Sequence, residues 1–247
     1  MPNDIVFEPV LRKLGRFEAL SGAEREAINN LPYRLRNLDA GAYIVREGDV
    51  AENCCALLSG FAFRHKVTSE GERQIVSIQI PGDFVDLQNS MLGIADHSVQ
   101  ALTTAEVAFV PRDAIREITA KFPTVGRVLW LDTLVDASIF REWVLNVGRR
   151  NSRSRVAHLI CEFGVRLADA GLASDHSYEM PMTQEQIGDC VGLTPVHVNR
   201  TLKSLERDGL IRRQRRSVQI IDWDRIQEIA DFNPRYLHQD MLKPGMR

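Results

Sequence analysis

Polar and cationic side chains recur on one face of the segment that follows Thr194. A proline costs about 3 kcal/mol inside a helix, but Pro195 fits as the first helical residue, where its missing N–H has no partner to lose. Thr194 is then the N-cap of this helix, and Gly192 ends a preceding helix that begins after Thr183. The apolar face of the second helix holds Val198, Leu202 and Leu205, and the other side holds Val196, His197, Asn199, Arg200, Lys203 and Arg207. Arginine and asparagine can read base edges in the major groove, so the pattern predicts a DNA-binding helix-turn-helix.

A basic hairpin is expected directly after this helix. Gly209 ends the helix, and "LIRRQRRSVQIIDW" alternates apolar and polar residues around four arginines, which we place at the hairpin tip: Arg212, Arg213, Arg215 and Arg216. Such a wing would contact phosphates. The predicted DNA contacts are Thr183, Gln184, Thr194, Val196, His197, Asn199, Arg200, Lys203, Arg215, Arg216 and Ser217.

Charge divides the chain into two parts. Residues 1–148 carry 15 Lys and Arg against 20 Asp and Glu, whereas residues 149–247 carry 16 against 13. The acidic first part and the basic second part indicate two domains. The positive charge of the second domain makes it the candidate for binding a polyanion. No apolar run reaches the roughly 18 residues needed to cross a bilayer, and the first residues lack the order of a secretion signal. We therefore expect a cytoplasmic protein that does not enter a membrane.

Residues 38–112 have the pattern of short strands. Apolar runs alternate with Gly48, Gly60, Gly71 and Gly82, at spacings typical of an antiparallel sandwich or barrel. Residues 1–37 are expected to form short helices, one of them opened by a capping box that starts at Ser21.

A long helix over about residues 124–147 is apolar on more than one side, so two faces must be covered. One apolar face can pack on the sandwich. The other face can pack against the same helix of a second copy of the chain, which is the simplest way to bury it. The alternative is a helix buried within one monomer. The predicted dimerisation residues are Val128, Leu131, Leu134, Val135, Ser138 and Leu145. The basic, glycine-led stretch 148–154 is predicted to be a hinge, and an amphipathic helix follows it.

The remaining reactive side chains give weaker patterns. Cys54 and Cys55 point to opposite faces of a strand, and together with Cys190 they are candidate redox residues, although small buried core residues explain them better. No metal site is predicted, and no nucleophile-elbow, P-loop, dinucleotide-binding or zinc-protease motif occurs, so we do not expect an enzyme. The alternative function is a ligand-binding or redox-sensing regulator whose basic C-terminal domain contacts a protein.

The order of these parts resembles the CRP/FNR family of bacterial transcription regulators over almost the whole chain. The resemblance implies an α+β fold with an N-terminal antiparallel, jelly-roll-like β-roll of the cyclic-nucleotide-binding type, a long dimerisation helix and a C-terminal winged helix-turn-helix. It implies domains at 1–122 (sensor), 123–150 (dimerisation helix and hinge) and 151–247 (DNA binding). It further implies a homodimer that binds a near-palindromic site on double-stranded DNA and contacts RNA polymerase. Arg200 matches the arginine of the family's recognition helix, but Val196 stands where the family usually has glutamate, which puts the usual half-site in doubt.

The predicted sensor pocket departs from the family pattern. Cyclic-AMP-binding members carry an Arg-Ser pair that faces the phosphate, where this chain has Ala95 and Asp96, and no Lys or Arg occurs between Arg73 and Arg112. A cyclic phosphate needs a positive partner, so tight cyclic AMP binding is not expected. No cysteine precedes Cys54, so the iron–sulfur cluster of the oxygen-sensing branch is not expected either. The candidate pocket residues, for an unknown small effector, are Asp83, Phe84, Leu87, Asp96 and His97.

Overall fold

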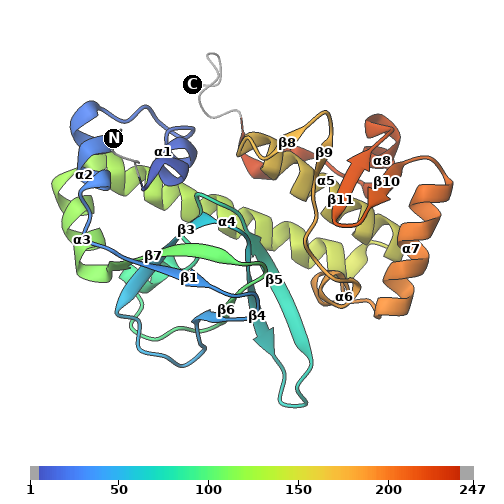
Figure 1. Cartoon of the computed structure of the whole chain (residues 1–247), viewed down its shortest axis with the longest axis horizontal. Helices are drawn as coiled ribbons and strands as arrows, with labels where there is room; N and C mark the ends of the chain where they lie inside the picture. The colour runs from blue at the N-terminus through green and yellow to red at the C-terminus, as the bar shows by residue number, and fades with distance from the viewer. Residues whose placement is uncertain (1–5, 240–247) are drawn as a thin grey trace. The chain divides into compact units, whose positions relative to one another are not determined.

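The computed structural model describes residues 6–239, which divide into two compact units (Figure 1). The N-terminal unit comprises residues 6–66, 78–137 and 238–239, and the C-terminal unit comprises residues 67–77 and 138–237. No helix in the described part is long and apolar enough to cross a membrane.

Two antiparallel sheets, with strand orders β1-β7-β3 and β2-β6-β4-β5, form the sandwich. The strands are β1 (Arg34–Leu38), β2 (Tyr43–Val45), β3 (Asn53–Ser59), β4 (Ala62–Val67), β5 (Arg73–Gln79), β6 (Ser98–Ala101) and β7 (Ala105–Pro111). Four predicted turn glycines, Gly48, Gly60, Gly71 and Gly82, have positive φ, the left-handed region that other residues rarely enter. The alternation of β3 places Cys55 and Leu57 in a core shared by both sheets, with Leu38, Val99 and Val107.

Helices cover the other face of the sheet that contains β3 and β7. They are α1 (Glu8–Leu14), α2 (Gly22–Asn29), α3 (Arg112–Lys121) and the first half of α4 (Pro123–Arg149), with the 3-10 helix η1 (Leu87–Ser90). The capping box predicted at Ser21 is confirmed, because Ser21 Oγ accepts from the Glu24 N–H while the Glu24 carboxylate accepts from the Ser21 N–H. Cys54 belongs to this helix-side core, so the two adjacent cysteines lie on opposite faces, as expected.

The C-terminal unit combines helices with a four-stranded sheet of order β10-β11-β9-β8. Its elements are α5 (Ser152–Asp169), β8 (Ala173–Ser174), β9 (Ser177–Glu179), α6 (Gln184–Val191), α7 (Pro195–Arg207), β10 (Ile211–Gln214), β11 (Ser217–Ile220), α8 (Trp223–Ala230) and η2 (Pro234–Leu237). Helix α5 is the centre of this unit, and its apolar face is buried as predicted, at Val156, Leu159, Ile160, Phe163 and Leu167. The fold is therefore α+β, with an antiparallel β-sandwich, a long helix and a winged helix-turn-helix.

Candidate nucleic-acid interface

Local capping interactions fix both helices of the helix-turn-helix. Thr183 Oγ1 accepts from the Gln186 N–H at 3.2 Å, and the Gln186 side chain accepts from the Thr183 N–H at 2.8 Å. Gly192 ends α6 with φ +66°, and Thr194 Oγ1 accepts from the His197 N–H at 3.3 Å, with Pro195 as the first residue of α7. The helix start, turn and second start predicted from the sequence are all confirmed.

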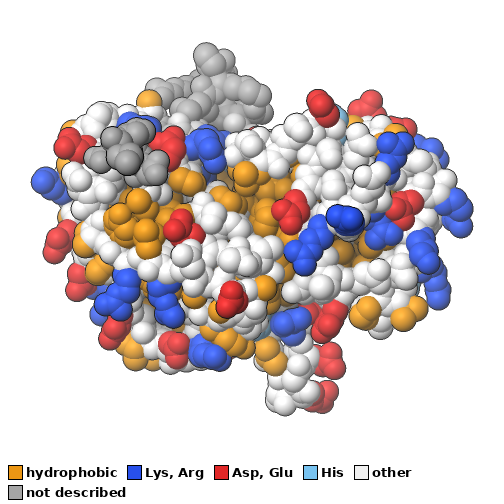
Figure 2. All heavy atoms as spheres, viewed as in Figure 1, with side chains coloured by type: hydrophobic (Ala, Val, Ile, Leu, Met, Phe, Trp, Pro, Cys, Tyr) orange, Lys and Arg blue, Asp and Glu red, His pale blue; other side chains and the backbone are white. Residues whose placement is uncertain are grey.

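The two faces of α7 separate cleanly. Val198, Leu202 and Leu205 are buried, as expected, together with Thr201. Val196 is 70% exposed, an unusual position for an apolar side chain, and Asn199 is partly exposed. Figure 2 shows Lys and Arg side chains along the edge of the molecule where Figure 1 draws α7. Of the residues predicted to contact DNA, the structure exposes Thr183, Gln184, Thr194, Val196, His197, Arg200, Lys203, Arg215 and Arg216, and partly exposes Asn199 and Ser217.

The wing differs from the expectation of four arginines at its tip. Strands β10 and β11 pair from Ile211 with Ile220 to Gln214 with Ser217, so only Arg215 and Arg216 occupy the turn. Arg215 has φ +54°, a left-handed conformation that fits a two-residue hairpin loop. Arg213 lies within β10 and pairs with Glu206 at 2.7 Å. The register of the hairpin, not the run of positive charge, decides which arginines lie in the turn.

A hollow of about 520 Å³ beside α7 brings in residues that the sequence reasoning missed. It is lined mainly by polar and cationic side chains from the start of α5 and from α7: Ser152, Arg153, His197, Arg200, Thr201, Lys203, Ser204 and Arg207. The basic stretch 148–154 is the sequence signal for this surface, although its composition predicts a hinge. Arg153 is held in place by Asp208 at 2.7 Å and by Ser204 Oγ at 2.9 Å.

The exposed apolar face of α4 is shifted from the predicted set. Val128 is fully buried in the helix-side core and Ser138 is also buried, whereas Leu131 and Val135 are partly exposed and Leu134 and Leu145 are exposed. Trp130 and Val144, which the prediction did not include, are 66% and 70% exposed. The apolar residues exposed on α4 are thus Trp130, Leu134, Val144 and Leu145.

The predicted sensor residues lie beside cations that come from distant parts of the chain. Asp83 is buried and pairs with Lys13 of α1 at 2.8 Å, and Lys13 also pairs with Asp132 of α4 at 2.5 Å. Arg64 of β4 donates to Asp136 at 2.8 Å and to the carbonyl of Val85 at 2.7 Å. The segment between Arg73 and Arg112 contains no Lys or Arg, but Lys13 and Arg64 from other segments contact it in the folded unit.

The other sensor candidates are divided between the core and the surface. Phe84 and Leu87 pack in the helix-side core. His97 is buried, and its Nδ1 lies 2.5 Å from the carboxylate of Asp96, which is largely exposed. Burial lowers the pKa of His97, whereas its hydrogen bond with Asp96 lowers the pKa of that carboxyl. Gln88 contacts the other ring nitrogen of His97 at 3.2 Å.

All four cysteines are buried and unpaired with each other. Burial raises the pKa of Cys54 to about 12 and raises the pKa values of Cys55, Cys161 and Cys190 well above their usual range. A thiolate is the reactive form, so this environment disfavours thiol chemistry in the folded state. Among residues 6–239, no group of three or more His, Cys, Asp or Glu side chains is placed to hold a metal ion.

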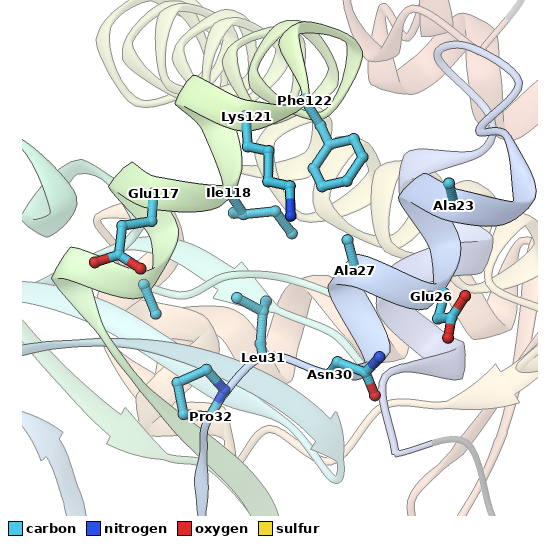
Figure 3. Close-up of a pocket in the computed structure, with 11 residues that line it drawn as sticks. Ala23, Glu26, Ala27, Asn30, Leu31, Pro32, Glu117, Ile118, Lys121 and Phe122 are labelled. Carbon is cyan, nitrogen blue, oxygen red and sulfur yellow. The ribbon is translucent and has the colours of Figure 1, made fainter.

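A second hollow, also of about 520 Å³, lies between α2 and α3 in the N-terminal unit (Figure 3). Its apolar lining residues include Ala27, Leu31, Ile118 and Phe122. In the close-up, the Lys121 side chain points into the hollow, whereas Glu26 and Glu117 point away from it. This surface is separate from the predicted sensor residues.

Comparison with known proteins identifies both parts of the chain. A model of the cyclic nucleotide-binding domain matches residues 35–122, and a model of the Crp-like helix-turn-helix domain matches residues 154–229. The transcriptional activator protein FnrL of Cereibacter sphaeroides is 30% identical over 199 residues, which are 79% of each chain. The fumarate and nitrate reduction regulatory protein of Escherichia coli is 23% identical over 211 residues, 85% of this chain and 84% of that protein.

A solved structure shares the same arrangement of elements. FixK2 of Bradyrhizobium japonicum superposes with a TM-score of 0.74 at 25% identity, covering 81% of this chain and 98% of FixK2. The match extends across both the sandwich and the helix-turn-helix.

Proposed function

The chain belongs to the CRP/FNR family of bacterial transcription regulators, and we propose that it acts as a homodimer that binds a near-palindromic DNA operator through α7. The observation that carries the proposal is the exposed face of α7, which presents His197, Arg200 and Lys203 opposite a face packed into the core. A helix of this kind fits the major groove, and two copies would read half-sites one turn of B-form DNA apart.

Base readout is assigned to the first half of α7. Arg200 can donate two hydrogen bonds to the O6 and N7 atoms of a guanine. His197 or Asn199 can supply further polar readout, and the exposed methyl groups of Val196 can contact a thymine methyl. With Val196 in place of the family's usual glutamate, we infer a half-site that differs from the family's usual one.

Phosphate contacts are assigned to the elements on either side of α7. Thr183 and Gln184 lie at the N-terminus of α6, where the helix dipole favours an anion. Arg215 and Arg216 at the wing tip, with Ser217, would contact the backbone farther along the duplex. Thr194 adds a polar side chain at the start of α7.

The second copy would cover the exposed side of α4. Trp130, Leu134, Ala137, Arg141 and Val144 follow one another at spacings of four and three residues, the repeat of a coiled-coil seam. Trp130, Leu134 and Val144 are exposed in the monomer, and burying them would offset part of the entropy lost on association. We therefore propose a dimer seam that keeps Leu134 and has Trp130 and Val144 in place of Leu131 and Leu145.

We propose a sensor domain at 1–122, a dimerisation helix and hinge at 123–150 and a DNA-binding domain at 151–247. Tight cyclic AMP binding is not expected, because Arg64 and Lys13 already pair with carboxylates. A cyclic phosphate would have to displace these carboxylates before it could bind either cation. The sensor takes an effector of another chemical class, or none. We expect no iron–sulfur cluster.

The relatives named above include an activator, and we propose the same role here, with RNA polymerase as partner and the cytoplasm as location.

Selection from a random 30-base-pair pool tests the proposal. The full-length protein should enrich a near-palindromic sequence, and Arg200→Ala should weaken binding to it by about 5- to 150-fold while relaxing the choice at one base pair in each half-site. Arg225→Ala, which removes an exposed arginine from α8, is the matched control and should leave the sequence preference unchanged. A protein that enriches no sequence, or whose affinity is insensitive to salt, is not a DNA-binding regulator.

A further inference from the structure

The short connection between α4 and α5 is held by several internal hydrogen bonds. Helix α4 ends at Arg149 and α5 begins at Ser152, with Asn151 as N-cap accepting from the Ser154 N–H at 3.0 Å. Arg150 pairs with Glu142 at 2.7 Å and with Asp231 at 3.2 Å. Arg150 of the predicted hinge therefore bonds within the C-terminal unit.

Arg155, in the first turn of α5, connects three segments of that unit. Its Nε donates to the carbonyl of Arg150 at 2.8 Å, and its Nη1 donates to the carbonyl of Val191 at 3.1 Å. Its own carbonyl accepts from the Asn146 side chain of α4 at 3.3 Å. The side chain of this half-buried arginine thus joins the connection after α4 to the end of α6, and its backbone carbonyl accepts the bond from α4.

The hydrogen bond from Arg155 to the carbonyl of Val191 lies at the C-terminus of α6. The last carbonyls of a helix have no partner within that helix, and the partial negative charge at a helix C-terminus favours a cation. The backbone N–H groups of Gly192 and Leu193 both donate to the carbonyl of Gly188, and Arg155 supplies a charged donor to the carbonyl of Val191. A Cβ atom on Gly192 would lie 3.5 Å from Nη1 of Arg155, so the guanidinium rests directly against the turn.

We propose that Arg155 is a positioning residue for DNA recognition, which holds the turn between α6 and α7 at a fixed place relative to the end of the dimerisation helix. The turn from Gly192 to Thr194 sets the direction in which α7 leaves α6. Two α7 helices must be placed relative to one dimer axis to read both half-sites, so the link from α4 to this turn controls base readout without touching DNA. This inference rests on the proposed function, since it requires that α7 reads DNA.

The expected signature is a loss of specific binding with non-specific binding retained. Base contacts need α7 within a narrow range of positions, whereas phosphate contacts tolerate displacement. In the full-length protein, Arg155→Met should weaken binding to the selected sequence by about ten-fold or more, and binding to a scrambled duplex of the same length by less than about two-fold. Arg155→Lys keeps the charge and one donor, so it should recover part of the specific affinity.

Three measurements separate this role from the alternatives. If Arg155 contacted a phosphate, Arg155→Met would reduce the slope of log K against log salt by about 0.9, and the proposal would be wrong. If Arg155 only stabilised the fold, urea denaturation would show the loss, while specific and non-specific affinities of the folded fraction would be unchanged; this also overturns the proposal. Faster amide exchange at residues 191–194 in Arg155→Met would support it.

Arg149→Met is the matched control, because it removes the same charge from an exposed position six residues earlier and should change neither affinity by more than about two-fold. If the wild-type protein enriches no sequence from the random pool, the proposed function fails. If the wild type binds specifically and Arg155→Met binds equally well, only the positioning role fails.

Discussion

Gly188 is the tightest point of the helix-turn-helix, and Gly188→Ala tests the packing of α6 on the turn. A Cβ atom at this position would lie 2.3 Å from the carbonyl oxygen of Leu193. The obstructing atom belongs to the backbone, so no side-chain rotation can relieve the contact. Either α6 or the turn must shift by about 0.7 Å or more for normal packing. Leu193 N–H donates to the carbonyl of Gly188 at 3.1 Å in the same place.

The expected loss of stability follows from three terms. Overpacking in a tight site costs about 1–3 kcal/mol. Weakening the hydrogen bond from Leu193 costs about 1 kcal/mol more. Alanine recovers about 1 kcal/mol over glycine in helix propensity. The free energy of unfolding should therefore fall by about 1–3 kcal/mol, and specific DNA affinity should fall with it because the turn carries α7.

Urea denaturation of the full-length protein measures the loss in the free energy of unfolding. Binding to the selected duplex measures the loss of specific DNA affinity. Gly148→Ala is the matched control, since Gly148 is also helical and a Cβ there would meet nothing within 4 Å. It should stabilise the protein by about 0.5–1 kcal/mol. If Gly188→Ala were as stable as the wild type and bound the duplex equally well, the close approach of α6 to the turn would be refuted.

Three further predictions concern other parts of the molecule. Leu134→Glu places a charge at the centre of the proposed seam on α4 and should shift the protein from dimer to monomer in sedimentation velocity; an unchanged dimer would move the interface elsewhere. The four buried thiols should react with Ellman's reagent at pH 8 only after unfolding, because burial raises their pKa values; rapid labelling of the native protein would contradict this. Burial raises the pKa of Asp86 from 3.8 to about 6, so the folded state binds the proton more tightly than the unfolded state. Stability should therefore fall by up to about 3 kcal/mol as the pH rises from about 4 to 6, and Asp86→Asn should flatten this dependence in urea titrations at each pH.

The order of elements and the helix-turn-helix were predictable because they depend on short-range interactions. A cap acts over three residues, as at Thr183 with Gln186 and Thr194 with His197, and a left-handed turn is a property of Gly192 alone. The turn glycines of the sandwich act in the same way. Each of these signals lies within a few residues of the structure that it specifies.

The faces of α4 and the wing were predicted less well. A long helix that is apolar on several sides does not reveal which side meets its own domain, and only packing against α1, α3 and the sheet buries Val128 while leaving Trp130 exposed. In the wing, hairpin register decides that Arg213 lies within a strand beside Glu206, although the sequence shows only a run of like charges.

By itself, the sequence determined the class of fold, the start and end of both helices of the reading unit and the polar side of α7, because capping, turn and amphipathic preferences are local. Only the tertiary structure decided which charged and polar groups pair with one another. Lys13 reaches Asp83, Arg64 reaches Asp136 and Arg155 reaches the carbonyl of Val191, each across a long stretch of chain. Such pairs form because burial forces each polar group to find a partner among whatever side chains the packing brings near, and no local pattern records that choice.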